Sequence, residues 1–406
     1  MLDKIEMRIP VDASLVEVRD DSKYCIFGFD LLDLSIRFDA MEVYKDEDGE
    51  KHHQVLRHPY SRLPTSYTKM AFKFAHEGAV YPYVQIKASL AKLLQGHNVF
   101  GSDDIEQGAY EMIGFLHMAY PVLTKMLDWT RAWVSHIDVT YSAKLSDQTT
   151  AKKVLDFLAN VSNGQTRLSN KRFDSSVYWG GQTSKLVNHK YYLKHDKFLS
   201  QFEELKQLAK KNDKSAQRVV DVMSDSRLIN WTVGLLRFES RLKKRWLERN
   251  GVPTNLYELI AFQKANPNLL QTLWTKATHG IFDAMRGQTV KLINDESVLE
   301  AISNSPVVVT NSGKVSQTCI RNIYSTYCLV CEHGLEKLAE MLPKPTFYRH
   351  LSELCDCGFS KAYLQNLHDE KASNIIPFVK LVEIDFNQQL PDWYEEPVSQ
   401  FNYQIA

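Results

Sequence analysis

The chain has 406 residues, with 49 Lys and Arg against 49 Asp and Glu, and 44% of its residues are hydrophobic. This length and composition predict two globular domains with cores of ordinary size. No run approaches 18 uncharged apolar residues, which excludes a membrane-spanning helix, and zero net charge excludes a general polycation. Any binding of nucleic acid must therefore use a local cluster of positive charge. The start, MLDKIEMRIPVD, lacks the apolar core of a signal peptide, so we expect a cytoplasmic protein.

Residues 1–145 are predicted to form mainly β-strands. Alternating or β-rich runs occur at KYCIFGFDLL, KMAFKFA, VYPYVQIKAS and WVSHIDVTYSA, with turn-prone polar segments between them. A helix is expected over 104–128. Pro121 should kink or end it, because proline lacks the backbone donor that a helix needs.

The middle of the chain continues the sheet. A short helix is expected at 150–160, then strands at SSVYWGG and HKYYLKHDKF, and an amphipathic helix at 198–222. The run WTVGLLRFESRLKKRW alternates apolar with charged residues, which predicts a strand with one face of each kind. After about 255 the pattern is helical. We therefore expect an α+β protein with an antiparallel sheet in a domain over 1–255 and a mostly helical domain over 256–406.

Two polar residues stand out in the strand WVSHIDVTYSA. His136 and Asp138 are two apart, so on a strand they point from the same face. A histidine beside a carboxylate suits a divalent metal that polarises a phosphate. The alternative is an ordinary pair of polar residues on a solvent-facing strand.

A tyrosine and a lysine share one strand face in HKYYLKHDKF. Tyr192 lies two residues from Lys194, whereas Tyr191 points from the opposite face. A phenol becomes a nucleophile only when its developing charge is offset, and a nearby lysine or metal does this. Aromatic packing on a strand is the alternative.

The strand LLRFESRLK places an acid between two guanidinium groups. Glu239 lies between Arg237 and Arg241 on one face, and Lys243 follows. Arginine binds phosphate in a bidentate manner, and the acid can complete a metal site or pair with its neighbours. The three strands together supply a nucleophile, metal ligands and phosphate-binding cations.

Seven segments, in this order, resemble the gene II replication proteins of filamentous bacteriophages: HPYSRLPTSY, VQIKASLAKLLQGHNVFG, VSHIDVTYSA, NVSNGQT, YYLKHDKF, LLRFESRLK and PDWYEEPV. The resemblance covers almost the whole chain. It implies a rolling-circle initiator that binds the origin of the double-stranded replicative form and nicks the viral strand through a covalent phosphotyrosine. The nick leaves a 3′-OH for host polymerase, and the displaced strand is later rejoined into a single-stranded circle.

The family is also similar to HUH-like and plasmid rolling-circle initiators, whose core is an antiparallel sheet with a divalent-metal site. The resemblance thus implies Mg²⁺ or Mn²⁺ as cofactor, and double- and single-stranded DNA at the phage origin as partners. Host helicase, polymerase and single-strand-binding protein are further expected partners, with no membrane. The place of action would be the cytoplasm of the host bacterium.

By the same resemblance, Tyr192 is the nucleophile with Lys194 beside it, and Asp138 and Glu239 are the better metal ligands. The chain departs from the HUH signature because only His136 is present where that signature has two histidines. Two histidines are alternatives for the third ligand, His97 of QGHNVFG and His195. Tyr191 is the rival nucleophile. The cations expected to bind DNA are Arg237, Arg241, Lys243 and, in the C-terminal domain, Arg349.

The C-terminal helices suggest a second DNA-binding unit. The family makes a shorter product from an internal start, for which Met285 is the candidate here. Residues 314–357 are typical of a helix-turn-helix, with Arg349 in the segment TFYRHL that opens the expected recognition helix. A plain three-helix packing motif is the alternative.

Two other functions fit parts of the sequence. One is an origin-binding protein or repressor without chemistry, based on the C-terminal helices. The other is a metal-dependent nuclease that uses water in place of tyrosine. Covalent attachment of the protein to DNA distinguishes the first interpretation from both.

Overall fold

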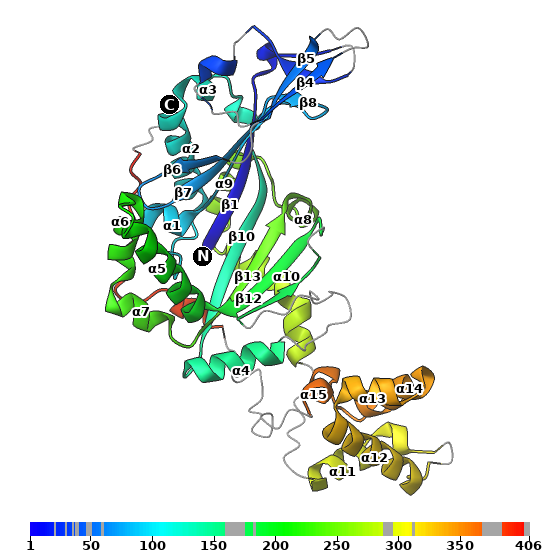
Figure 1. Ribbon diagram of the computed structural model, residues 1–406. Coiled ribbons are helices and arrows are strands. Elements are labelled where there is room, and N and C mark those ends of the chain that lie inside the picture. Colours follow the sequence, from blue (N-terminus) through cyan, green and yellow to red (C-terminus); the bar gives the residue numbers. More distant parts are fainter. Residues whose placement is uncertain are drawn as a thin grey trace.

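The computed structural model describes the chain except residues 20–21, 29–30, 35, 37–39, 46–50, 58–60, 159–174, 182–183, 287–294, 311–312, 368–383 and 402–406. Its centre is an eight-stranded sheet in the order β11-β12-β13-β10-β1-β9-β7-β6, in which all neighbours are antiparallel (Figure 1). The strands are β11 (Ser176–Trp179), β12 (Val187–Leu193), β13 (Leu235–Lys243), β10 (Trp133–Lys144), β1 (Leu2–Pro10), β9 (Tyr83–Ser89), β7 (Lys69–Ala75) and β6 (Ser61–Pro64).

Two small sheets complete the strand-rich part of the chain, and short 3₁₀ turns occur along the whole chain. The strands are β2 (Val16–Val18), β3 (Tyr24–Ile26) and β8 (Glu77–Gly78) in one sheet, and β4 (Ala40–Lys45) and β5 (Lys51–Arg57) in the other. The 3₁₀ turns are η1 (Ala13–Leu15), η2 (Leu31–Leu34), η3 (Trp129–Arg131), η4 (Pro306–Val308) and η6 (Phe386–Gln388).

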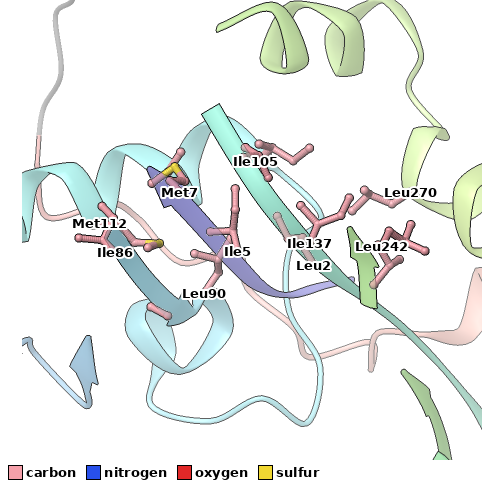
Figure 2. Packing of buried hydrophobic residues seen from close by; sticks show 14 of the residues in the cluster. Leu2, Ile5, Met7, Ile86, Leu90, Ile105, Met112, Ile137, Leu242 and Leu270 are labelled. Atoms are coloured by element: carbon pink, nitrogen blue, oxygen red, sulfur yellow. The ribbon is translucent and has the colours of Figure 1, made fainter. Parts of the chain in front are cut away.

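One face of the large sheet is apolar and buried by helices. On β13 the buried residues Leu236, Phe238 and Leu242 alternate with polar ones, as predicted. Figure 2 shows how apolar side chains from the central strands meet those of the covering helices. The covering helices are α1 (Leu90–Gln95), α2 (Ile105–Ala119), α4 (Gln148–Leu158), α9 (Leu256–Ala265) and α10 (Leu269–Arg286).

A second small core lies between the sheet and three helices that follow β12. These are α5 (Lys194–Ala209), α6 (Lys214–Met223) and α7 (Ser226–Thr232). Their residues Phe198, Phe202 and Met223 pack with Val99 and Phe100 of the loop after α1. Two short helices complete this region, α3 (Pro121–Lys125) and α8 (Lys244–Arg249).

The last five helices in the sequence lie together, apart from the large sheet (Figure 1). They form their own hydrophobic core, which includes Ile323, Val330, Leu338 and Leu354. They are α11 (Asp295–Ser303), α12 (Gln317–His333), α13 (Leu335–Met341), α14 (Lys344–Asp356) and α15 (Lys361–Asn366).

The α+β class, the antiparallel sheet and the helical C-terminal region are confirmed. The expected helix over 104–128 is divided at Pro121, where α3 begins. The domain boundary stays a prediction, and the two helices that follow residue 255 pack on the sheet, whose core includes Leu259 of α9 and Trp274 of α10. The indole of Trp274 also donates a hydrogen bond of 3.1 Å to the carbonyl of Phe238 on β13.

Two expected elements differ from those observed. The strand over HKYYLKHDKF ends at Leu193 and Lys194 begins α5, because Phe198 and Phe202 recur at helical spacing and bury one helix face. The helix expected over 198–222 is two helices. They are separated by a turn in which Asn212 has a φ of 64°, a left-handed conformation that ends a helix.

Candidate functional site

The polar face of the large sheet brings the predicted residues of three strands together. In the register of β12 with β13, Tyr192 lies opposite Arg237 and Lys190 opposite Glu239. One step further along the sheet, Arg241 of β13 lies opposite Asp138 of β10. The alternation of side chains along each strand therefore places the expected nucleophile, acids and cations on one surface.

Tyr192 is only 4% exposed, and burial raises the pKa of its phenol. The positive charge of Arg237 opposes this rise in pKa, whereas the negative charges of Glu239 and Asp3 add to it. The ammonium group of Lys190 lies 4.4 Å from the centre of the Tyr192 ring. Charged groups around the phenol therefore shift its pKa in both directions.

Tyr191, the rival nucleophile, lies in the hydrophobic core. It is 0% exposed, and its ring packs 4.6 Å from those of both Trp179 and Phe238. Burial raises the pKa of its phenol, and among the described residues its hydroxyl has no hydrogen-bond partner. Tyr191 therefore has neither access to a substrate nor a group that would stabilise its anion.

A loop that the sequence did not single out as catalytic organises the charged groups around Tyr192. Asn98, in the segment QGHNVFG, accepts a hydrogen bond of 2.8 Å from Lys194 Nζ and donates one of 2.8 Å to Asp3 Oδ1. Arg237 donates hydrogen bonds to the backbone carbonyls of Asn98 and Val99. The loop thereby connects the start of β1, the start of α5 and the middle of β13.

Lys194 keeps its predicted proximity to the site even though it begins a helix. Its side chain is buried, and burial together with the nearby charges of Arg237 and Lys92 lowers its pKa well below the usual value. Asp3 is also buried, and although burial raises the pKa of its carboxyl, Arg237 and the amide of Asn98 keep that pKa below its usual value. No sequence pattern pointed to Asp3. It lies within an irregularity of β1, where the register with β10 shifts between Leu2 and Lys4.

Glu239 and Asp138 have different environments. The pKa of Glu239 is raised to about 7 by burial and by the negative charges of Asp3 and Asp138. Asp138 is 0% exposed, and both of its carboxylate oxygens accept hydrogen bonds of 2.7 Å from Arg241. Asp138 is therefore neutralised by an arginine, whereas Glu239 is an acid that changes protonation state near neutral pH.

The four predicted metal ligands do not form one group. His136 lies 3.9 Å from Asp138 and 3.8 Å from Glu6, and burial lowers its pKa to about 4. His97 is on the other side of the site, where Lys194 and Arg237 help burial to lower its pKa to about 3. Positive neighbours disfavour a metal ion there.

His195, the other alternative for the third ligand, is engaged elsewhere, because its Nδ1 lies 2.7 Å from the hydroxyl of Thr232. In the part of the chain that the structure describes, no three His, Cys, Asp or Glu residues are arranged to bind a metal ion. The predicted ligand set therefore does not fit a metal centre as a group. Neither does Asp138 alone, whose oxygens are already occupied by Arg241.

The position of Arg237 does not fit the predicted contact with DNA. Its side chain is 1% exposed, and its guanidinium is committed to loop carbonyls. Lys243 donates to the carbonyl of Ser184, and Arg241 is paired with Asp138 but still has a 37% exposed side chain.

Partly exposed cations that were not singled out continue from Arg241 across the same face. The side chains of Lys4, Arg8 and Lys87 are 31%, 33% and 34% exposed, and each lies within 4.0 Å of the buried acids Asp138 or Glu6. Together with Arg241 they form a row of positive charge, here called the cation row (Lys4, Arg8, Lys87 and Arg241). The row concentrates positive charge on one face of a chain whose net charge is zero.

The helical region presents Arg349 to solvent, as its predicted contact with DNA requires. On α14, Phe347 and Leu351 are buried, whereas Tyr348 is 63% exposed and the Arg349 side chain is 68% exposed. His350 instead faces α12, where its Nδ1 lies 2.7 Å from the hydroxyl of Thr326. Over 314–357 the structure has α12, the short helix α13 and α14, in this order.

Two known protein families match this chain. The N-terminal family of the phage gene II replication-associated protein matches residues 1–265, and the C-terminal family of the same protein matches residues 309–400. The chain belongs to the gene II family of replication-associated proteins. The N-terminal match contains the large sheet and Tyr192. The C-terminal match contains α12 to α15 and the segment that follows them.

Individual relatives agree with the gene II assignment over nearly the full length. The chain is 36% identical over 419 residues to the gene II replication-associated protein of Salmonella phage IKe, covering 99% of this chain and 98% of the relative. It is 34% identical over 410 residues to that of Enterobacteria phage M13, covering 98% and 99%. No solved structure matches this gene II family member. Among its described residues, no helix is both long and apolar enough to span a membrane.

Proposed function

We propose that this gene II family member starts rolling-circle replication of a phage genome by nicking the viral strand at the origin. The observation on which the proposal chiefly rests is the position of Tyr192. It is the tyrosine of the pair that shares the polar face with Arg237, Glu239 and Lys190, while Tyr191 is enclosed by aromatic rings. Relatives named as phage replication-associated proteins support the same function.

In the proposed reaction, the oxygen of Tyr192 attacks the phosphorus at the nick site. A bond forms between this oxygen and phosphorus, and the bond from phosphorus to the O3′ of the preceding nucleotide breaks. The products are a 5′-phosphotyrosine and a free 3′-OH, which takes up a proton. Attack of a 3′-OH on the phosphotyrosine reverses these steps and rejoins the displaced strand into a circle, so no external energy source is needed.

Glu239 is the group that we propose accepts the phenolic proton. Its pKa of about 7 is matched to proton transfer near neutral pH, and its charge acts directly on the pKa of Tyr192. Lys190 would offset the negative charge that grows on the reacting oxygens, and Lys194 would hold Asn98 through its hydrogen bond of 2.8 Å. Arg237 would hold the loop against β13, the strand next to Tyr192, because its hydrogen bonds join β13 to Asn98 and Val99.

The cation row supports binding of DNA across the polar face. Phosphates spaced along a strand favour several separate cations over one concentrated site. The acids beneath the row, Glu6 and Asp138, hold its side chains in place without removing their exposure. We therefore propose that this face, next to Tyr192, receives the strand to be nicked.

A divalent cation, Mg²⁺ or Mn²⁺, remains a prediction. Such an ion would stabilise the negative charge of the reacting phosphate when bound. Because the predicted ligands do not converge, no step above depends on it. We likewise propose host polymerase, helicase and single-strand-binding protein as later partners, and the host bacterial cytoplasm as the site of action.

The rival functions lack either the nick or the covalent bond, so one experiment separates them. Purified protein is incubated with supercoiled origin-bearing DNA and Mg²⁺, and the reaction is stopped with denaturant. The proposal expects relaxed circles and a protein–DNA adduct that survives denaturation. Nicks without an adduct would indicate a nuclease that uses water, and binding without nicks would indicate an origin-binding protein without chemistry.

A further inference from the structure

The segment that follows the C-terminal helices returns to the sheet domain. Residues 384–401, here called the C-terminal strap, lie beside α7 and α2 and are drawn in red in Figure 1. Trp393 is contacted by the guanidinium of Arg227 on α7, 4.9 Å from the ring centre. On α2, Gln107 donates a hydrogen bond of 2.6 Å to the carbonyl of Pro397.

The strap is attached to the sheet domain at both of its ends. At its start, the side-chain amide of Gln389 accepts a hydrogen bond of 2.8 Å from the backbone N–H of Ser142. It also donates one of 2.9 Å to the carbonyl of Ser142, so that it occupies both backbone groups as a paired strand does. At its end, Ser399 donates 2.5 Å to Glu111 of α2, and the ring of Phe401 packs 5.0 Å from that of Phe115. These contacts include buried polar groups and fix the path of the strap.

Between these ends the strap packs against the loop that organises the Tyr192 site. The rings of Trp393 and Tyr394 meet that of Phe100 edge-on, at 5.2 Å and 5.6 Å between centres. Phe100 is 3% exposed and lies two residues after Asn98. One side of the loop thus contacts the strap, while the other side binds Lys194, Asp3 and Arg237.

We propose that Trp393 and Tyr394 are positioning residues for the nicking site. They hold Phe100 in place and thereby keep the carbonyls of Asn98 and Val99 where Arg237 binds them. Edge-on aromatic pairs of this kind stabilise a defined ring geometry beyond the area they bury. The strap, more than 190 residues after Tyr192 in sequence, is thus a part of the catalytic domain that the chain supplies only after its helical region.

This inference depends on the proposed nicking function, so its test includes a readout without DNA cleavage. The full-length variant Trp393→Ala/Tyr394→Ala is compared with the parent in single-turnover nicking, origin binding and hydrogen exchange of residues 97–101. We expect nicking at least about tenfold slower, because a small displacement of positioning groups costs this much. Origin affinity should stay within about twofold, since the cation row is untouched. Hydrogen exchange in the loop should become faster.

Two further variants separate positioning from general damage. Trp393→Phe/Tyr394→Phe keeps the rings and should restore nicking to within about threefold of the parent. Val398→Ala changes a strap residue that is 85% exposed and should leave nicking and loop exchange unchanged. If circular dichroism shows the double alanine variant to be unfolded, the milder Tyr394→Leu replaces it with the same expectations.

A parent-like nicking rate in the alanine variant, or unchanged exchange of the loop, would overturn the positioning role. So would a phenylalanine variant as slow as the alanine one. If the parent itself forms no nick, the proposed function fails, and loop exchange still decides whether the strap orders the loop.

Discussion

Tyr192 and Arg237 lie directly opposite each other where β12 pairs with β13, and the charge of Arg237 opposes the rise in the Tyr192 pKa caused by burial. Arg237 cannot move freely toward a substrate, because the carbonyls of Asn98 and Val99 bind its guanidinium. The pair therefore places the proposed nucleophile beside a fixed positive charge.

Replacement of Tyr192 by Phe should abolish both nicking and formation of the covalent adduct. The ring is retained, so the packing of Lys190 on it and the affinity for origin DNA should be nearly unchanged. The measurements are gel electrophoresis of origin plasmid and a denaturing assay for protein-bound DNA.

Tyr191→Phe is the matched control. It removes a buried hydroxyl that has no partner among the described residues, so nicking should persist. The free energy of unfolding should not fall and can rise by about 1 kcal/mol, because an unsatisfied buried polar group is lost. An adduct formed by Tyr192→Phe but not by Tyr191→Phe would reverse the assignment.

The pH dependence of nicking should report Glu239. A proton acceptor must be ionised, and the pKa of Glu239 is raised to about 7. At limiting DNA, the nicking rate should therefore rise as pH increases through about 7 and then level off. Glu239→Gln should lower the rate by about 10²-fold and remove the rise, whereas Glu6→Gln, which changes an acid further along the face, should keep it. A rate independent of pH between 6 and 8, about one unit to each side of this pKa, would exclude Glu239 as the acceptor.

The sequence was most informative where side-chain alternation decides the structure. The charged face of LLRFESRLK follows from a period of two, as does the placement of Tyr192 and Tyr191 on opposite faces of the sheet. Both features are present in the structure. Alternation in HKYYLK also predicts a strand at Lys194. The helix begins there because residues beyond the motif, Phe198 and Phe202, bury a helical face.

Other features could not be predicted because they depend on contacts between distant segments. Asp3, Asn98 and Lys194 lie far apart in sequence and meet only through the folded loop. The commitment of Arg237 to backbone carbonyls is equally invisible in a strand pattern, which shows only that an arginine lies on the polar face. The same holds for Asp138, whose carboxylate is occupied by Arg241.

Removal of divalent metal tests the predicted cofactor directly. If Mg²⁺ or Mn²⁺ takes part, EDTA should stop nicking, and either ion should restore it. Asp138→Asn offers a contrast, because the structure assigns Asp138 to Arg241 and not to a metal. We expect this variant to unfold more easily by about 1 to 3 kcal/mol, since Arg241 is left without its partner but remains partly exposed. Urea denaturation measures this loss, and nicking that persists in EDTA would remove the metal from the mechanism.

The cation row should determine the salt dependence of DNA binding. Substituting Lys87 or Arg8 by Ala removes a partly exposed charge, so the slope of log affinity against log salt should decrease by roughly one unit for each. Lys264→Ala is a suitable control, because Lys264 is 64% exposed but is paired with Glu106 at 2.6 Å and lies on α9. Its slope should match that of the parent. If the Lys87 and Arg8 variants also have the slope of the parent, DNA does not cross this face.

The last prediction concerns the product expected from the internal start at Met285. This residue lies in the last turn of α10, so the product would lack the sheet but keep α11 to α15 with their own hydrophobic core. We expect the fragment from Met285 onward to be helical by circular dichroism and to bind double-stranded DNA without nicking it. Its affinity should fall steeply with salt, because phosphate contacts release counterions.

Within this fragment, Arg349→Ala should weaken binding more than Lys337→Ala. Both residues are exposed, but Arg349 is on α14 next to Tyr348, whereas Lys337 is on α13. An alternative control, Lys371, lies outside the described residues. Each lost phosphate contact should lower the salt slope by roughly one unit. The fragment should also compete with the full-length protein for double-stranded DNA, which would limit replication as the product accumulates. A fragment that is helical but binds no DNA at low salt would show that α12 to α14 are a packing unit and that Arg349 is not a contact.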